Sequence, residues 1–241
     1  MTPPMRVDLN ADVGEIPDTA SDAALMPQLT SASIACGVHA GSQERMRSTV
    51  ELALLHRVAI GAHPGLADPG GFGRREIDAT PGEVETLVVR QVYALAEIAA
   101  ESGARVRHVK VHGALYNMAA RDAALADAVA RAVASVDRSL VLFGLAGSER
   151  VRAGERAGLR VASEGFADRA YDAEGFLVPR SQPGCVITDP HVVTAQALAL
   201  VREQKIDSIC VHGDTPNAAN LASRVRQALI AAGFELRAIS T

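Results

Sequence analysis

Aromatic residues are scarce in this sequence: tryptophan is absent, and phenylalanine and tyrosine together make up only 3% of the 241 residues. Hydrophobic residues nevertheless reach 48%, much of it Ala, Val and Leu, so we expect a large aliphatic core in one domain. The three cysteines, Cys36, Cys185 and Cys210, are odd in number and lack CxxC spacing. This pattern indicates neither a disulfide framework nor a zinc ribbon.

Long apolar runs and basic clusters are missing as well. No run approaches the roughly 18 residues of a membrane span, and the N-terminus lacks the charged start and apolar middle of a signal peptide. The net charge is −4, and the basic pair Arg74-Arg75 is too short for a nucleic-acid footprint. These absences argue against membrane and nucleic-acid partners, and they favour a soluble cytoplasmic protein.

The first predicted strand carries a polar face. Residues 7–12 alternate apolar and polar, which is the period of a strand and places Asp8, Asn10 and Asp12 on one side. A strand buried in an α/β core carries such a face only where water, a metal or a ligand meets it. After a glycine that allows a turn, Glu15 adds a further carboxylate. We therefore expect chemistry at the carboxyl end of this strand.

The same plan repeats along the chain: an apolar strand, a polar or histidine-bearing end, a glycine and a helix. Strands are predicted at 7–12, 33–37, 59–62, 106–111, 140–145, 161–165 and 208–211, and a further one at 235–239. Seven or eight strands alternating with helices, in a chain near the typical length of about 250 residues, favour a closed parallel (β/α) barrel. A doubly wound open sheet is the alternative, but it would concentrate polar residues at one switch point rather than at nearly every strand end.

The regular rhythm stops after the sixth predicted strand. Residues 166–188 show no helical period and carry Arg169 and Arg180 among other polar residues. A long irregular segment beside a strand end is more often a functional lid than a filler. We therefore predict a single α/β barrel domain over 1–241 with this insertion.

Four histidines stand at equivalent places, each at the carboxyl end of a predicted strand: His39, His63, His112 and His212. In a barrel those ends converge on one mouth, where active sites of this architecture are built. One such histidine alone would more readily be structural, but four together favour a functional site. The other three histidines are predicted to be surface or packing residues: His56, His108 and His191.

Two kinds of chemistry fit these side chains, and the sequence leaves both open. Asp12, His39 and His63 form a two-histidine, one-carboxylate set suited to zinc or a similar divalent ion. No HxxH or HExxH spacing supports this metal site. Alternatively, a carboxylate paired with an imidazole supplies acid–base chemistry tuned near neutral pH.

Lys110 is predicted to face the same side of its strand as His112. A lysine inside a barrel needs an anionic partner. Glu164 or a carboxylate of the first strand would supply it, and so would a substrate carboxylate or phosphate. A structural ion pair and a substrate contact are equally good interpretations.

A loop dense in glycine spans 65–75 and resembles a phosphate cradle in composition. Gly71 and Gly73 leave backbone N–H groups accessible, and Arg74 and Arg75 offer forked donors. The loop is not a P-loop, because no Gly-Lys-Ser/Thr follows. Glycine is also common in loops for turn geometry alone.

Seven segments, in order along nearly the whole chain, together resemble the LamB/YcsF family, which is that of the 5-oxoprolinase A subunits. They are DLNADVGE at 8–15, ACGVHAG at 35–41, GAHPG at 61–65, GFGRR at 71–75, HVKVHGALYN at 108–117, EGFADR at 164–169 and VHGDTP at 211–216. One departure is Val111, where the family usually has proline. It should alter the stiffness of the backbone there and little else.

The resemblance implies a barrel similar to those of glycoside hydrolases and polysaccharide deacetylases. It implies cleavage of 5-oxo-L-proline to L-glutamate, coupled to hydrolysis of ATP, with magnesium, to ADP and phosphate. It also implies two partner subunits, B and C. A five-membered lactam is a poor electrophile. Phosphorylating its amide oxygen would turn that oxygen into a leaving group, and water could then attack.

Such a reaction needs a phosphate cradle, an acid–base pair and an anchor for the substrate carboxylate. Our hypothesis gives phosphate to residues 71–75, water activation to Asp12 with His39 or His63, and the anchor to Lys110 or Arg169. The catalytic candidates are Asp12, His39, His63, Lys110, His112, Glu164, His212 and Asp214. The candidates for binding substrate or phosphate are Asp8, Asn10, Glu15, Gly71, Gly73, Arg74, Arg75, Arg169 and Arg180.

Two other functions stay open. The chain could be a metal-dependent amidase or deacetylase that acts without ATP, or a substrate-binding subunit whose partners carry out the chemistry. Its Ala-rich helices could serve a homo-oligomer interface or simply pack on the barrel.

Overall fold

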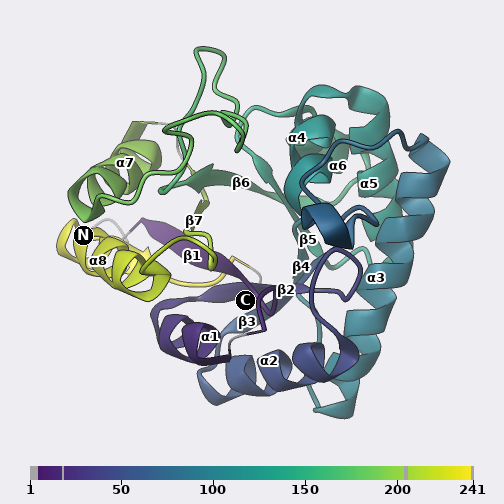
Figure 1. Cartoon of the computed structure of the whole chain (residues 1–241), viewed down its shortest axis with the longest axis horizontal. Helices are drawn as coiled ribbons and strands as arrows, with labels where there is room; N and C mark the ends of the chain where they lie inside the picture. The colour runs from purple at the N-terminus through teal and green to yellow at the C-terminus, as the bar shows by residue number, and fades with distance from the viewer. Residues whose placement is uncertain (1–4, 18, 204–205, 240–241) are drawn as a thin grey trace.

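The computed structural model describes residues 5–17, 19–203 and 206–239. The strands are β1 (Arg6–Val13), β2 (Ser31–Ala35), β3 (Ala59–His63), β4 (His108–Val109), β5 (Val141–Leu145), β6 (Arg160–Phe166), β7 (Ser208–Cys210) and β8 (Glu235–Leu236). All pairings in the sheet are parallel, and β1 is hydrogen-bonded to both β2 and β7. The first seven strands therefore close into a barrel, which confirms the predicted fold against the open sheet (Figure 1). The short strand β8 pairs with the start of β1.

The fourth strand is shorter than predicted, although its backbone continues toward the barrel mouth. Beyond Val109, the Lys110 N–H donates to the Ala62 carbonyl at 3.0 Å, and the His112 N–H donates to the Pro64 carbonyl at 2.8 Å. This extension brings Lys110 and His112 beside the end of β3.

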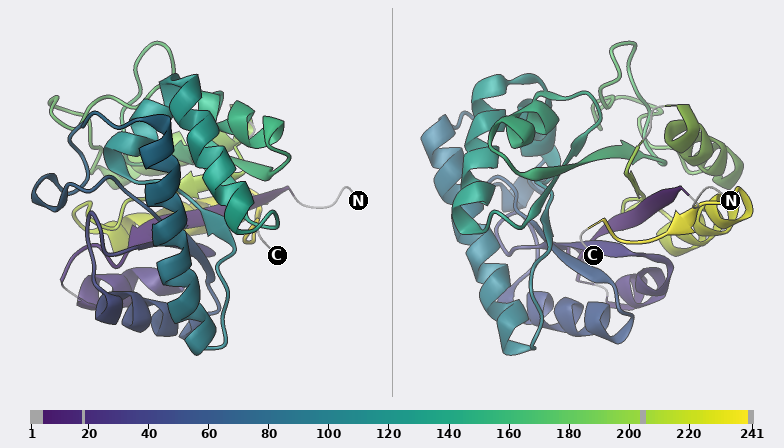
Figure 2. Two further views of the ribbon diagram at one scale, coloured as in Figure 1. Left: turned by 90° about the vertical axis from the view of Figure 1, so that its right-hand side faces the viewer. Right: turned by 180° about the vertical axis from the view of Figure 1, so that it is seen from behind.

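The helices cover the outside of the barrel (Figures 1 and 2). They are α1 (Thr19–Leu25), α2 (Gln43–Leu55), α3 (Pro81–Glu101), α4 (Gly113–Arg121), α5 (Ala123–Val136), α6 (Glu149–Arg156), α7 (Pro190–Glu203) and α8 (Ala218–Ala231), with short 3-10 turns at Met26–Gln28 and Pro69–Gly71. Side chains cap two of these helices: Ser42 caps α2, and Thr80 and Glu83 form a capping box at the start of α3. None of the helices in the described part of the chain combines the length and the apolar character needed to cross a membrane.

Helices α4 and α5 meet at a single residue. Asp122 ends α4 as its C-cap and begins α5 as its N-cap, accepting hydrogen bonds from the N–H groups of Ala124 and Leu125. The two helices are therefore consecutive, with no loop between them. Four alanines of α5 are buried, and α5 packs against α3, α4 and α6, so this alanine-rich face is used in packing within the chain: Ala126, Ala128, Ala130 and Ala132.

His108 lies inside the barrel rather than on its surface. The side chain is fully buried and stacks on Phe143, with 4.4 Å between the ring centroids. Gly61 makes room for it, because a Cβ at that position would lie 2.0 Å from His108 Nε2. The packing interpretation of His108 is therefore confirmed.

The segment between Phe166 and Pro190 contains no helix and projects as a loop beside the barrel (Figure 1). Two isolated antiparallel bridges fold it, Arg169 with Val186 and Tyr171 with Leu177. The Arg169 guanidinium donates to the carbonyl groups of Cys185 at 3.0 Å and Val178 at 2.5 Å. Arg169 therefore holds the insertion in shape.

Candidate active site

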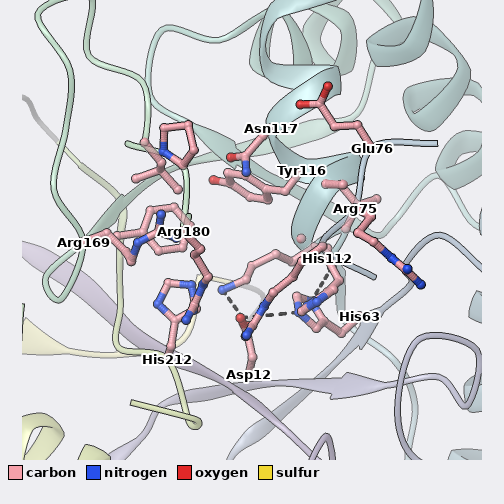
Figure 3. A pocket seen from close by; sticks show the side chains of 18 of the residues that line it. Asp12, His63, Arg75, Glu76, His112, Tyr116, Asn117, Arg169, Arg180 and His212 are labelled. Atoms are coloured by element: carbon pink, nitrogen blue, oxygen red, sulfur yellow. Dashed lines mark hydrogen bonds and ion pairs between the residues drawn. The ribbon is translucent and has the colours of Figure 1, made fainter. Parts of the chain in front are cut away.

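A pocket of about 410 Å³ opens at the carboxyl ends of the strands. Asp12, His63, Lys110, His112 and His212 line it from the barrel side. Arg169 and Arg180 of the insertion also line it, and Figure 3 shows them with His212 across the pocket from His63 and His112. The pocket thus joins the predicted strand-end residues with the predicted insertion.

Lys110 is the centre of a buried network at the pocket floor. Its ammonium group donates to Asn10 Oδ1 at 2.8 Å and to Glu164 Oε1 at 2.9 Å, and lies 2.8 Å from Asp12 Oδ1. Burial opposes the lysine charge, but the carboxylates of Asp12 and Glu164 outweigh it and hold the pKa of Lys110 well above its usual value. The predicted ion pair with Glu164 or a first-strand carboxylate is present with both.

The surrounding buried groups also shift the pKa values of the acids near Lys110. Burial tends to raise the pKa of Asp12, but the nearby His63 and Lys110 overcome it, and the pKa lies well below its usual value. The Tyr116 hydroxyl donates to Glu164 Oε2 at 3.0 Å, and burial raises the pKa of Tyr116 well above normal. Asp12 is therefore a carboxylate, and Tyr116 stays a neutral donor.

Glu15 and three histidines form a second cluster beside this network. Glu15 Oε1 lies 2.9 Å from His112 Nδ1, 3.3 Å from His39 Nε2 and 3.5 Å from His63 Nε2. His63 Nε2 and His112 Nδ1 are 2.9 Å apart, and the rings of His39 and His112 stack at 4.0 Å. Three of the four strand-end histidines thus converge, as predicted, with Glu15 as their shared carboxylate.

Asp12 stands at the edge of this cluster. Its Oδ2 is 3.4 Å from His63 Nε2, while its other oxygen faces Lys110. The predicted metal set of Asp12, His39 and His63 remains a prediction, and the three histidines are gathered more closely around Glu15.

His212, the fourth histidine, is paired with Asp168. Its Nδ1 is 2.9 Å from Asp168 Oδ1, while Asp168 Oδ2 accepts from the His212 backbone N–H and from the Thr215 hydroxyl. Burial would raise the pKa of Asp168, but His212 lowers it to about 2. A carboxylate that holds one imidazole nitrogen leaves the other for the pocket. The sequence prediction missed Asp168 because it lies in the aperiodic insertion.

Three loops meet at the rim of the pocket through Asp214. Its Oδ2 is 2.5 Å from Arg74, and its carboxylate also lies 3.3 Å from Arg180. Arg75 instead pairs with Asp68, and Figure 3 shows its side chain extending away from the other labelled residues. Of the two predicted loop arginines, Arg74 therefore belongs to the ion-pair group at the rim.

Backbone N–H groups of the glycine-rich loop donate to carbonyl groups of the same loop. The N–H groups of Gly71 and Gly73 donate to the Asp68 carbonyl, and that of Arg74 donates to the Gly71 carbonyl. Gly73 has a φ of +65° and approaches His39 and His112 too closely to carry a Cβ. Phosphate binding by this loop stays a prediction that would rest on arginine side chains rather than on these backbone donors.

Asp8 and Asn10 lie deeper in the barrel and do not line the pocket. Asp8 accepts hydrogen bonds from the hydroxyls of Thr30, Ser31 and Ser208, and burial raises its pKa to about 6. Asn10 bridges Lys110 and Glu164. These two residues support the site from below.

Comparisons with known proteins show the family of this chain. A family model described as "LamB/YcsF family" matches residues 7–241. Two proteins named as the A subunit of 5-oxoprolinase, from Tolumonas auensis and Bordetella pertussis, are 49% and 50% identical, covering 97% and 96% of this chain and 99% and 98% of their own. The solved structure of the lactam utilization protein from Thermus thermophilus is 43% identical, with a TM-score of 0.89 over 98% of this chain and all of that one.

More distant structures share the fold alone. The catalytic domain of a peptidoglycan N-acetylglucosamine deacetylase from Eubacterium rectale is 10% identical, with a TM-score of 0.56 over all of this chain and 92% of its own. Since the family model and the relatives both extend over nearly the whole length, the chain belongs to the LamB/YcsF family.

Proposed function

We propose that this chain is the A subunit of an ATP-dependent 5-oxoprolinase, which cleaves 5-oxo-L-proline to L-glutamate. The observation that carries the proposal is the near 50% identity, over almost the full length, to proteins named as the A subunit of 5-oxoprolinase. The pocket supports it, because about 410 Å³ suits a small ring with one carboxylate and lies near the lower end of the roughly 300–1,000 Å³ of ligand sites.

The pocket offers the groups that opening a lactam requires. Arg169 and Arg180 supply positive charge for the substrate carboxylate. His212, oriented by Asp168, is placed to take a proton from water, and Asp12 with His63 is the alternative base. Lys110 is occupied by three oxygen partners, so its role would be to keep Asp12 charged and in place.

The use of ATP would require the complex of this chain with its partner subunits. We propose that ATP, with magnesium, transfers its terminal phosphoryl group to the amide oxygen and leaves as ADP, and that partner subunits B and C are needed for this step. Water then adds to the activated carbon, and the ring C–N bond breaks as the nitrogen takes up a proton. A second water hydrolyses the resulting acyl phosphate to glutamate and phosphate. Arg74, paired with Asp214 at the rim, would meet the phosphoryl group as it enters. Because ATP is the phosphoryl donor, we place the reaction in the cytoplasm.

The test measures glutamate and phosphate release from 5-oxoproline and ATP, with this chain alone and with subunits B and C added. Equal release of both products, only with all three chains, would support the proposal.

Asp12→Asn should lower glutamate formation by more than about 100-fold, because the Asp12 carboxylate lies between Lys110 and His63. Circular dichroism and thermal unfolding should show the variant folded.

Two results would contradict these assignments. Full activity of Asp12→Asn would remove Asp12 from the mechanism. Hydrolysis of an amide by this chain alone, without ATP, would instead favour the amidase or deacetylase function, which the shared barrel and the histidine cluster keep open.

A further inference from the structure

Four buried side chains aim one donor atom each at a common point. The atoms belong to Glu15, His39, His63 and His112, and all lie within 4.8 Å of one another. Each of these residues is at least nine-tenths buried. Four converging donor atoms in a buried site require a cation among them, either a proton on one ring or a metal ion.

The outer hydrogen bonds of two rings fix which nitrogens face inward as acceptors. His63 Nδ1 is 2.7 Å from the Lys110 carbonyl, and His112 Nε2 is 2.8 Å from the Phe72 carbonyl. A carbonyl only accepts, so each of these nitrogens carries the proton of a neutral ring. The facing atoms, His63 Nε2 and His112 Nδ1, are then two lone pairs at 2.9 Å. Carbonyl acceptors behind the rings are also the usual outer partners of metal-binding histidines.

The spacing of the donor atoms fits a small divalent ion. Bonds of about 2.0–2.1 Å to zinc place neighbouring tetrahedral ligands about 3.3 Å apart. The separations are 2.9 Å between His63 and His112, and 2.9, 3.3 and 3.5 Å from Glu15 to the three histidines. Each of these four distances differs from 3.3 Å by no more than a few tenths of an ångström, so these atoms would need to move only slightly to bind the ion.

The charges around the cluster also call for a cation. Asp12, Glu15 and Glu164 are three buried carboxylates, and Lys110 is the one buried ammonium group in direct contact with two of them. Asp8 and Arg150, which are also buried and act on Glu164, add one charge of each sign near neutral pH. The four carboxylates and two cations therefore leave an excess of two negative charges when the histidines are neutral. A divalent ion would cancel that excess.

We propose that Glu15, His39, His63 and His112 bind one divalent transition-metal ion of the zinc type. Imidazole donors favour such ions, whereas Mg²⁺ and Ca²⁺ prefer oxygen. His63 and His112 also line the pocket, so the ion would lie at its wall, within reach of a substrate carbonyl as a Lewis acid. Binding itself does not depend on the proposed oxoprolinase function.

The test measures metal binding by the whole chain and needs no activity assay. The protein is stripped with a chelator, and Zn²⁺ is then titrated while bound metal is counted. We expect one equivalent of Zn²⁺ per chain that excess Mg²⁺ does not displace. Glu15→Gln and His39→Gln should each weaken binding by more than about 100-fold, beyond the usual 10–100-fold cost of an outer partner. His191→Gln, at an exposed histidine of α7, is the matched control and should bind as the unmodified chain does.

X-ray absorption of the Zn²⁺-loaded unmodified chain gives a reading that does not depend on how any variant folds. Imidazole ligands in the spectrum are expected. Less than a tenth of an equivalent bound by the folded chain, a spectrum without imidazole, or unchanged affinity in both cluster variants would overturn the proposal. Such a failure would show a proton shared within the cluster, and it would leave the oxoprolinase assay to be judged by itself.

Discussion

Lys110 shows how one buried side chain sets the state of its neighbours. Its ammonium group contacts Asn10, Asp12 and Glu164, and it approaches the Cys210 sulfur at 3.1 Å. A buried charge is tolerated only where partners of this kind compensate its lost hydration. Lys110 is therefore better suited to fixing Asp12 than to anchoring a substrate carboxylate.

The Asp168 carboxylate holds His212 in the tautomer that leaves Nε2 free to accept a proton. In Asp168→Asn, the amide N–H would face His212 Nδ1 and move the ring proton to Nε2, which then cannot accept a proton from water. We expect kcat of the assembled enzyme to fall by roughly 10²–10⁴-fold. The measurement is steady-state glutamate release.

Thr215→Val provides the control for that variant. It removes the hydroxyl that donates to Asp168 Oδ2 at 2.6 Å but keeps the carboxylate on His212. Its kcat should change by less than about 10-fold, as for a single supporting hydrogen bond. Normal turnover in Asp168→Asn would show that His212 is not the base.

At the scale of elements, two ion pairs between partly exposed side chains tie the insertion to its surroundings. Arg121 of α4 lies 2.9 Å from Asp172 and over the Phe176 ring. Arg180 reaches Asp214 in the loop after β7, and Asp214 also holds Arg74 in the loop after β3. Closer to the barrel, Gln196 of α7 donates to the carbonyls of Phe166, Ala167 and Arg169. The part of the insertion around Arg180 therefore depends on the partly exposed Asp214 carboxylate, while its base is anchored by part-buried hydrogen bonds from Gln196.

Asp214→Asn should loosen that part of the insertion without unfolding the barrel. The amide loses the charge that holds both arginines, so hydrogen exchange should become faster in residues 170–186 and stay unchanged in β1–β7. Glu174→Gln, at an exposed carboxylate of the same insertion, is the control and should leave exchange as it is. Equal exchange in both variants would mean that Asp214 does not restrain the insertion.

The whole molecule places polar layers inside a barrel that most such folds fill with aliphatic side chains. His108 is one consequence: burial and the nearby Lys110 lower its pKa to about 3, so it stays neutral in the folded state. An unfolded histidine takes up a proton near pH 6.5. Below that pH the unfolded chain binds more protons, so folding stability falls as the pH falls.

We therefore expect His108→Gln to change the pH dependence of stability. Between about pH 6 and pH 4, the free energy of unfolding of the unmodified chain should lose about 1.4 kcal/mol per pH unit more than that of the variant. The raised pKa of Asp8 makes its contribution to the free energy of unfolding rise as the pH falls, which is the opposite direction. Because Asp8 is present in both proteins, this contribution cancels in the difference between them. Denaturant titrations at several pH values measure this, with exposed His56→Gln as the control. Parallel curves for His108→Gln and the unmodified chain would contradict the prediction.

The barrel and the gathering of histidines at its mouth follow from patterns in the sequence. Period-two strands, capped helices and glycines after each strand are local patterns, and parallel strands in a closed barrel must end at one rim. For that reason His39, His63 and His112 could be placed together from their positions in the sequence. The insertion was found in the same way, by the absence of a period.

Which groups contact one another depends on how the whole chain packs. Glu15 follows Gly14, whose φ of +71° turns the chain, so the direction of the Glu15 side chain depends on that turn rather than on strand alternation. Asp168 reaches His212 from an irregular segment whose path is set by packing. Lys110 took Asp12, Asn10 and Glu164 as partners because strands distant in sequence meet inside the barrel. Spacing along a chain does not encode such contacts.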